Sequence, residues 1–331
     1  MPHILTFGEL LLRLSPPGNE RLLQSARFDV SVGGCEANVA AGLAQFDVPV
    51  QYLTRLPDNA IADGALRALR AEGVGTKHVI RGGDRMGLYF LELGADVRGL
   101  RTVYDRAFSA FAGITPEQAP FDRALDGASW LHTSGIVAAL GDSAYQTLEA
   151  GIVQARAAGV RTSIDCNFRP SLWQGKNPQS LMLPLMPHVD LLIGNPGAFH
   201  EMLGEPTSGS MPEPPEALRH TAERLHRRFG MERIAITQRE VRDASTHAWR
   251  AWLWQAADGV LLEGGWYVVR VVDRVGGGDA FAAGLLAALY RDVPAADAIR
   301  FATAAGAHKL TVPGDFPRTT WEEIEGMQRG R

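Results

Sequence analysis

The sequence predicts an α/β protein, a three-layer sandwich with a mostly parallel central sheet and a small β-sheet lid. Strand-like runs such as ILTFGEL alternate with helix-like runs such as EANVAAGLAQF through most of the chain. Alternation of this kind is typical of a parallel sheet with helices on both faces. Two stretches, about residues 10–33 and 86–112, break this rhythm with strand-like alternation and glycine turns. They predict a separate small sheet.

The opening elements follow a βαβα order. Residues 1–8 predict a short apolar strand, since they lack the basic start, long apolar centre and cleavage site of a signal peptide. The second helix is expected to end at Gly73. Further along, Met211 to Pro215 is expected to form a surface loop. The stretch HAWRAWLWQAADGVLLEGG is expected to form a hairpin that turns at Asp258-Gly259.

The two irregular stretches are expected to pair as a small antiparallel sheet that stands off a single domain spanning residues 1–331. A β-flap on an α/β core is typical of a lid that closes over a substrate and excludes water. An edge extension or a dimer contact would produce the same pattern, and one flap can serve both purposes. We therefore expect a homo-oligomer, a dimer or higher, formed through the lid.

The composition indicates a globular protein with a small ligand. The chain has 331 residues, 46% of them hydrophobic and 21% charged, and a net charge of −4. This charge provides no strong field for nucleic acid or an anionic membrane, and no apolar stretch approaches the ~20 residues of a bilayer span. The only cysteines, Cys35 and Cys166, suit a reducing compartment. We expect a cytoplasmic protein without nucleic-acid or membrane partners.

Three consecutive glycines, Gly276, Gly277 and Gly278, stand between a strand-like run and an apolar, helix-like run that begins at Asp279. Backbone N–H groups at a helix N-terminus bind anions, commonly phosphate, and glycines let the ligand come close. The alternative is that Asp279 caps the helix and the glycines only close a turn.

If the anion is a transferring phosphoryl group, Asp279 would orient and deprotonate the attacking hydroxyl. The helix dipole is expected to lower the pKa of this carboxyl, so that it is ionised at neutral pH. The sequence contains no GxxxxGK[ST], HRD or DFG, which excludes the P-loop and protein-kinase scaffolds. The absence of GxGxxG at the glycines disfavours dinucleotide binding.

VDRVGGGDAF resembles the C-terminal signature of the ribokinase-like, or PfkB-type, carbohydrate kinases, and VGGCEANVAAGLAQF resembles their N-terminal signature. The resemblance covers essentially the whole chain. It is closest to the 2-keto-3-deoxygluconate kinases, through FGELLLRLSPPG, DCNFRPSLW and KLTVPGDF among other stretches. It implies a ribokinase-like fold, ATP and Mg²⁺ as cofactors with K⁺ as an optional one, and transfer of phosphate to the primary hydroxyl of a sugar acid. That acid would be 2-keto-3-deoxygluconate, giving the 6-phosphate.

Two alternatives stay open. The acceptor can be another sugar, such as fructose or ribose. The chain can also be an impaired homologue that binds a sugar acid without turnover.

The resemblance also implies roles for individual residues. Arg106 and Arg169 are expected to read the carboxylate of the acid, since guanidinium groups bind carboxylates bidentately. Asp273 is expected to help bind a monovalent cation, or else to be a turn residue. The expected substrate residues are Gly34, Asn38, Tyr89, Tyr104, Arg106 and Arg169, and the expected nucleotide residues are Asn195, Thr237, Arg239 and Lys309.

Several of these positions have a purely structural alternative. Asn38 can be a polar residue at a helix start, Thr237 a strand residue facing a neighbour, and Lys309 a solvated charge. Either arginine alone can be a surface residue.

One position departs from the family pattern. The family places an acidic residue that helps hold magnesium three positions after the strand-end asparagine, and here that position is Ala198. Glu201 lies one helical turn further along, at a distance of ~4.5 Å along the axis. Because the nucleotide phosphates and waters hold much of a bound Mg²⁺, we expect weakened rather than abolished metal binding.

Overall fold

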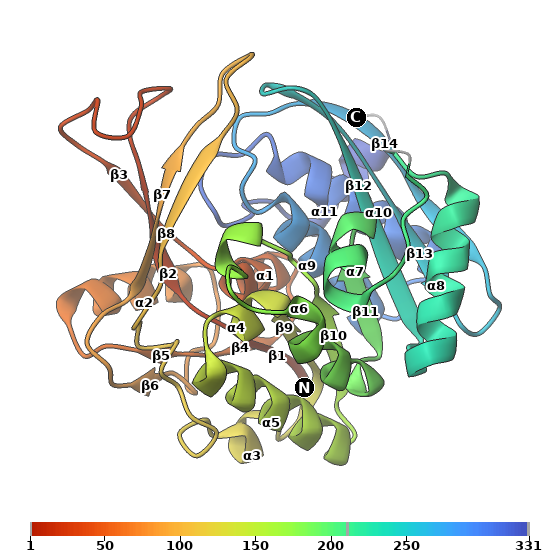
Figure 1. Ribbon diagram of the computed structural model, residues 1–331, viewed down its shortest axis with the longest axis horizontal. Coiled ribbons are helices and arrows are strands. Elements are labelled where there is room, and N and C mark those ends of the chain that lie inside the picture. Colours follow the sequence, from red (N-terminus) through yellow and green to blue (C-terminus); the bar gives the residue numbers. More distant parts are fainter. Residues whose placement is uncertain (1, 210–211, 330–331) are drawn as a thin grey trace.

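The computed structural model describes residues 2–209 and 212–329, and an eight-stranded sheet forms its centre (Figure 1). The strands from β4 to β12 pair in parallel, and β13 and β14 extend the sheet as an antiparallel hairpin. The expected mostly parallel sheet is therefore confirmed. In spatial order the strands are β14 (Leu261–Arg270), β13 (Thr246–Gln255), β12 (Arg233–Asp243), β11 (Leu191–Gly194), β10 (Arg161–Asp165), β9 (Ala128–Ser134), β1 (His3–Phe7) and β4 (Val50–Leu53).

Helices cover both faces of this sheet and form two separate apolar cores, which makes the three expected layers. The central parallel strands β1 and β11 are buried along their whole length because both faces are covered. One face carries α1 (Cys35–Gln45), α2 (Ala60–Ala71), α9 (Gly277–Tyr290), α10 (Ala295–Lys309) and α11 (Trp321–Gln328). The other carries α3 (Phe121–Ala124), α4 (Gly135–Ala139), α5 (Asp142–Ala157), α6 (Pro178–Met182), α7 (Pro196–Leu203) and α8 (Pro215–Phe229).

The local boundaries agree with the sequence. Helix α2 ends at Ala71, and Gly73 follows with a φ of 88°, a conformation that favours glycine. The β13–β14 hairpin turns at Asp258-Gly259 as expected. Of the expected loop at 211–215, residues 212–214 precede α8, while Met211 lies outside the described residues, as does Met1 of the first strand. In the described part of the chain, no helix has both the length and the apolar character of a bilayer span.

The lid is a four-stranded sheet in the order β3-β2-β7-β8, and it stands on the side of the molecule opposite the long β12–β13 hairpin (Figure 1). Each irregular stretch forms its own antiparallel hairpin, but β2 and β7, which join the two, are parallel. The expectation of a purely antiparallel sheet is wrong, because both stretches leave the body of the protein in the same direction. The strands are β2 (Leu11–Ser15), β3 (Asp29–Gly33), β7 (Gly87–Glu92) and β8 (Arg101–Asp105).

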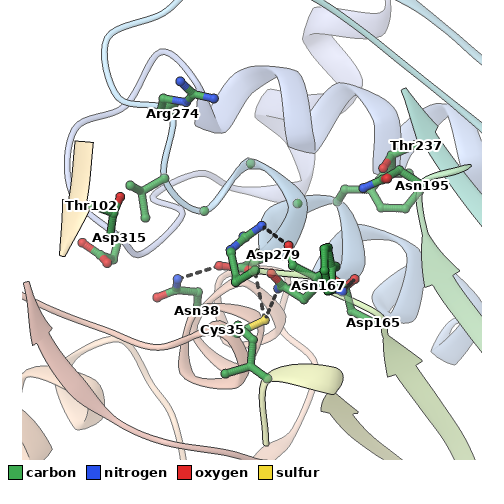
Figure 2. Close-up of a pocket in the computed structure, with 18 of the residues that line it drawn as sticks. Cys35, Asn38, Thr102, Asp165, Asn167, Asn195, Thr237, Arg274, Asp279 and Asp315 are labelled. Atoms are coloured by element: carbon green, nitrogen blue, oxygen red, sulfur yellow. Dashed lines mark hydrogen bonds between the residues drawn. The ribbon is translucent and has the colours of Figure 1, made fainter. Parts of the chain in front are cut away.

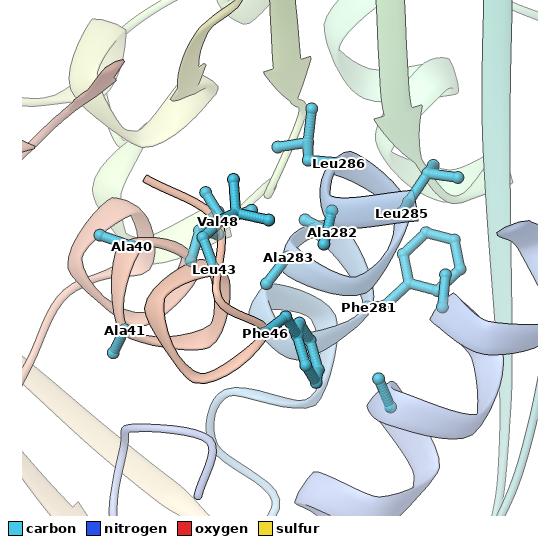
Figure 3. Close-up of a cluster of buried hydrophobic side chains, with 14 of the residues drawn as sticks. Ala40, Ala41, Leu43, Phe46, Val48, Phe281, Ala282, Ala283, Leu285 and Leu286 are labelled. Carbon is cyan, nitrogen blue, oxygen red and sulfur yellow. The ribbon is translucent and has the colours of Figure 1, made fainter. Parts of the chain in front are cut away.

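Helices α1 and α9 pack closely against each other under the lid (Figure 3). Their contact consists of small and apolar residues, and Gly42 of α1 faces Ala283 of α9. A Cβ atom added at Gly42 would lie 2.7 Å from the Cβ of Ala283 and 3.0 Å from the ring of Pro317. Gly42 therefore sets how closely the two helices approach.

Replacing Gly42 with alanine is expected to lower the free energy of unfolding by about 1–3 kcal/mol, because the methyl group overpacks a contact between two buried helices. The matched control is Gly64→Ala in α2, where the nearest atom to the added Cβ is 3.8 Å away at the mobile end of Arg67. This control is expected to gain about 0.5–1 kcal/mol from helix propensity. Urea unfolding of both variants measures the difference, and a stabilised Gly42→Ala protein would contradict the close packing.

Candidate active site

A cavity of about 550 Å³ lies between the lid and the body of the protein. It is located at the carboxyl ends of β10 and β11, which is where open α/β sheets bind ligands, and beside the middle of the longer strand β12. The N-terminal ends of α1 and α9 form its floor, and residues of β2, β7 and β8 form its lid side (Figure 2). It brings together these residues expected from the sequence: Gly34, Asn38, Tyr89, Tyr104, Arg106, Arg169, Asn195, Thr237, Arg239, Gly276, Gly277, Gly278 and Asp279.

The three glycines differ in how much room a side chain would have at each position. Gly276 precedes α9 with a φ of 82°, and a Cβ there would lie 2.6 Å from the carbonyl oxygen of Asp315. At Gly277 a Cβ would lie 3.0 Å from Leu310, whereas at Gly278 it would meet nothing within 4 Å. Gly277 and Gly278 are the first two residues of α9, and only Gly276 precedes the helix. The first N–H groups of α9 have no partner within the helix and border the cavity, an arrangement that suits an anion.

Asp279 does not cap the helix, because its carboxylate is bound by the N-terminal end of α1. Asn38 Nδ2 donates to one carboxylate oxygen at 2.7 Å, and Cys35 Sγ donates to the other at 3.2 Å (Figure 2). Burial raises the pKa of Asp279, although these two hydrogen bonds act in the opposite direction. The expected lowering of its pKa by the helix dipole is therefore wrong, since desolvation outweighs it.

Asp165, the last residue of β10, and Asn167, two residues later, are two site residues that sequence reasoning missed. Asn167 Nδ2 donates to Cys35 Sγ at 2.7 Å, and its backbone N–H donates to Asp165 Oδ1 at 2.9 Å. Ligand atoms of Cys35, Asp165 and Asp279 lie within 4.8 Å of one another. Burial, followed by the charge of Asp279, raises the pKa of Asp165 to about 7. Polar residues directly after a buried strand, in DCNF, were the signal available in the sequence.

The two expected carboxylate readers differ in their surroundings. Arg106 is buried, and its Nε donates to Glu9 at 2.6 Å, so one edge of the guanidinium is already bound while the residue borders the cavity. Ser109 also donates to Glu9. Arg169 is exposed at the cavity and forms no ion pair among the described residues. Arg106 is thus rigidly positioned, whereas Arg169 is free to reach a ligand.

Arg169, Arg239 and Arg274 bring unpaired positive charge to one part of the cavity. All three border it, and none of them pairs with a carboxylate in the described part of the chain. Burial, then the charges of Arg274 and Arg169, lowers the pKa of Arg239 to about 10. Unpaired guanidinium groups that repel one another at the rim of a cavity indicate a site for an anion of high charge. Arg274 was not singled out from the sequence, although it lies within the VDRVGGGDAF stretch.

Asn195 follows β11 and Thr237 lies within the neighbouring strand β12, on the side of the cavity away from the lid (Figure 2). Asn195 caps α7, with its Oδ1 accepting from the N–H of Ala198 at 2.9 Å, and Thr237 Oγ1 donates to the carbonyl of Gly194 at 3.3 Å. Ala198, within α7, is only 2% exposed and packs into the core. Glu201 is exposed and does not border the cavity. Glu201 therefore does not replace the carboxylate that position 198 lacks.

Two expected site residues, Asp273 and Lys309, do not border the cavity. Lys309 is fully buried, and its ammonium group donates to three backbone carbonyls, so it is neither a nucleotide contact nor a solvated charge. Asp273 is bound by Arg13 at 2.8 Å. Both residues lie behind the glycines, where they hold the loop that carries them.

The family model for pfkB family carbohydrate kinases matches residues 1–319. The chain is 39% identical to the 2-dehydro-3-deoxygluconokinase of Thermotoga maritima, covering 99% of this chain and 98% of that one with a TM-score of 0.95. It is 30% identical to a PfkB family carbohydrate kinase of Listeria grayi, covering 99% of both chains with a TM-score of 0.91. It is also 30% identical to the 2-dehydro-3-deoxygalactonokinase of Haloferax volcanii, over 99% of this chain and 97% of that protein. The ribokinase-like fold is thereby confirmed, and this chain belongs to the pfkB family of carbohydrate kinases.

Proposed function

We propose that the protein uses ATP to phosphorylate the primary hydroxyl of a sugar acid, 2-keto-3-deoxygluconate, and forms its 6-phosphate. One observation carries the proposal: the buried carboxylate of Asp279 lies beside the free N–H groups of α9, in a cavity bordered by unpaired arginines. The likeness to the 2-dehydro-3-deoxygluconokinase of T. maritima supports this acceptor. The impaired, non-catalytic alternative draws support from the carboxylate that position 198 lacks, but the proposed base and anion site argue against it.

Asp279 is proposed as the general base. It takes the proton of the acceptor hydroxyl as that oxygen bonds to the γ-phosphorus, and the bond from phosphorus to the β,γ-bridging oxygen breaks to release ADP. The N–H groups at Gly276, Gly277 and Gly278 stabilise the charge on the transferring phosphoryl group. The raised pKa of Asp279 makes it a better proton acceptor than an ordinary aspartate.

The acceptor is proposed to lie between α1 and the lid. Asn38 would contact its hydroxyls from α1, and Arg106 and Arg169 would bind its carboxylate. Arg106 is held in place by Glu9, which fixes the direction of its remaining N–H groups. Gly34, Tyr89 and Tyr104 complete the proposed acceptor site.

The nucleotide is proposed to lie on the opposite side, near Asn195 and Thr237, with Arg239 and Arg274 against its phosphates. Mg²⁺, when bound with ATP, neutralises phosphate charge. Among the residues that border the cavity, Asp165 offers the hard oxygen donors that this ion prefers and would help to hold it. Lys309 is not proposed as a nucleotide ligand.

The lid, about residues 10–33 and 86–112 of a single domain spanning 1–331, is proposed to close over the acceptor. Its outer side carries apolar residues that water reaches: Val30 is 61% exposed and Val103 is 42% exposed. This surface supports a homodimer formed through the lid. The two free cysteines support a cytoplasmic location.

Asp279→Asn is expected to retain nucleotide binding but to lower kcat by about 10²–10⁴, the range for a general base. The amide keeps the shape of the side chain and removes its proton affinity. Coupled measurement of ADP release gives kcat, and calorimetry gives the affinity for nucleotide. The control is Asp297→Asn, an exposed residue of α10 paired only with Arg300. Turnover of Asp279→Asn within about twofold of the unmodified enzyme would rule out the assigned role.

The acceptor is tested with a panel containing 2-keto-3-deoxygluconate, its C4 epimer 2-keto-3-deoxygalactonate, gluconate, fructose, ribose and adenosine. The acids are expected to give the highest kcat/KM. Arg169→Leu is expected to raise KM for the acids by about tenfold or more, since a charge-assisted contact is worth about 1.5–3 kcal/mol, and to leave neutral sugars unaffected. Preference for a neutral sugar would overturn the acceptor, whereas preference for the epimer would change only its stereochemistry.

The pH dependence follows from the raised pKa of Asp279. A base works in its ionised form, so kcat/KM is expected to fall as the pH drops through a value above the ordinary aspartate pKa of about 4. Asp165, whose pKa is raised to about 7, titrates together with Asp279. Asp165→Asn removes one of two like charges and is expected to move this acid limb to lower pH. An unchanged limb would contradict the coupling of the two carboxyls.

A further inference from the structure

Lys309 lies buried beneath the glycines at the start of α9, and its ammonium group binds only backbone oxygens. Its Nζ donates to the carbonyls of Val275 at 2.9 Å, Val312 at 2.9 Å and Gly314 at 2.8 Å. All three hydrogens of the ammonium group thus have acceptors. A Cβ built on Gly276 would lie 3.2 Å from Cε of Lys309, so the lysine side chain passes directly under the first glycine.

The charges in this buried region balance one another. Arg13 binds Asp273 at 2.8 Å and Asp315 at 3.2 Å, and all three side chains are at most 7% exposed. Burial lowers the pKa of Lys309, while the charges of Asp273 and Asp315 favour its protonated form. Two cations therefore face two carboxylates, and no unpaired negative charge is left to attract another cation.

The same residues do not fit an exchangeable monovalent ion. Such an ion needs carbonyl and carboxylate oxygens that can replace its hydration shell. Both oxygens of Asp273 are already used: one accepts from the N–H of Val275 at 3.0 Å, and the other accepts from the N–H of Gly314 at 3.1 Å and from Arg13. The nearby carbonyls are bound by Lys309. At Asp273, where the sequence predicts a monovalent cation, the protein's own groups already occupy the oxygens that would bind it.

We propose that Lys309 is a tethered cation that takes the place of an exchangeable monovalent ion and holds the phosphate-binding glycines in position. The carbonyl and the N–H of a trans peptide point in opposite directions. Because Lys309 holds the carbonyl of Val275, the N–H of Gly276 in the same peptide points away from the lysine, and Gly276 borders the cavity. The proposal rests on the proposed function only in assuming that this site receives a nucleotide phosphate.

The test measures binding of AMP-PNP, a non-hydrolysable ATP analogue, with Mg²⁺ by calorimetry, together with the thermal midpoint of unfolding. Both are recorded at equal ionic strength in potassium, sodium or tetramethylammonium chloride. The unmodified protein is expected to bind the analogue with the same affinity, within about twofold, in all three salts. Lys309→Met is expected to bind it about tenfold or more weakly in tetramethylammonium, and potassium is expected to restore affinity and raise the thermal midpoint. The control, Lys77→Met at an exposed lysine, is expected to behave like the unmodified protein.

Tighter binding of the analogue by the unmodified protein in potassium than in tetramethylammonium would overturn the proposal. So would a folded Lys309→Met variant that ignores potassium. If this variant does not fold, Lys309→Gln replaces it, since glutamine keeps two N–H donors without the charge, and the unmodified protein alone still decides whether potassium is required. Neither readout depends on the acceptor sugar. If the analogue binds in no salt, the proposed function fails, and the potassium response of the thermal midpoint still tests the role of Lys309.

Discussion

The site depends on the burial of one carboxylate, Asp279, where the N-terminal ends of two helices meet. Helix α9 carries the aspartate and the glycines, and α1 supplies the two donors that bind its oxygens. Because these donors are neutral, they satisfy the carboxylate without cancelling its charge. Asp279 has no ion pair among the described residues, so its negative charge remains available for a proton. The close packing at Gly42 and Ala283 fixes the distance between the two helices and hence the position of Asp279, the proposed base.

Charge is organised differently on the two sides of the glycines. Behind them, Arg13 and Lys309 face Asp273 and Asp315 in a buried and balanced group. In front of them, Arg169, Arg239 and Arg274 border the cavity and form no ion pair within the described residues, whereas Arg106 is paired with Glu9. The net charge of −4 gave no sign of these unpaired arginines, because a sum over the chain says nothing about where the charges lie. An anion entering the cavity gains the attraction of the unpaired arginines, while the balanced group behind keeps the backbone in place.

Local patterns in the sequence predicted most of the fold. Alternating elements, the end of α2 near Gly73 and the hairpin at Asp258-Gly259 depend on short-range chemistry, and all are present in the structure. The parallel pairing of β2 with β7 was not predicted, since strand order between distant segments is decided by tertiary packing. The pKa of Asp279 could not be predicted from local sequence either. Desolvation outweighs the helix dipole there, and this desolvation arises only when the surrounding elements assemble.

The lid and the glycines are parts of one electrostatic unit. Arg13 lies on lid strand β2. Its partner Asp273 belongs to the loop that leads into Gly276, and its partner Asp315 belongs to the loop that packs against Gly276. Tyr89, on lid strand β7, donates to Asp315 as well. Breaking a buried ion pair leaves an uncompensated charge, which costs about 3–5 kcal/mol, so these contacts hold the middle of β2 and β7 against the body. The proposed closure over an acceptor would therefore involve the parts of the lid beyond Arg13 and Tyr89, while these two residues keep the glycines aligned with Asp279.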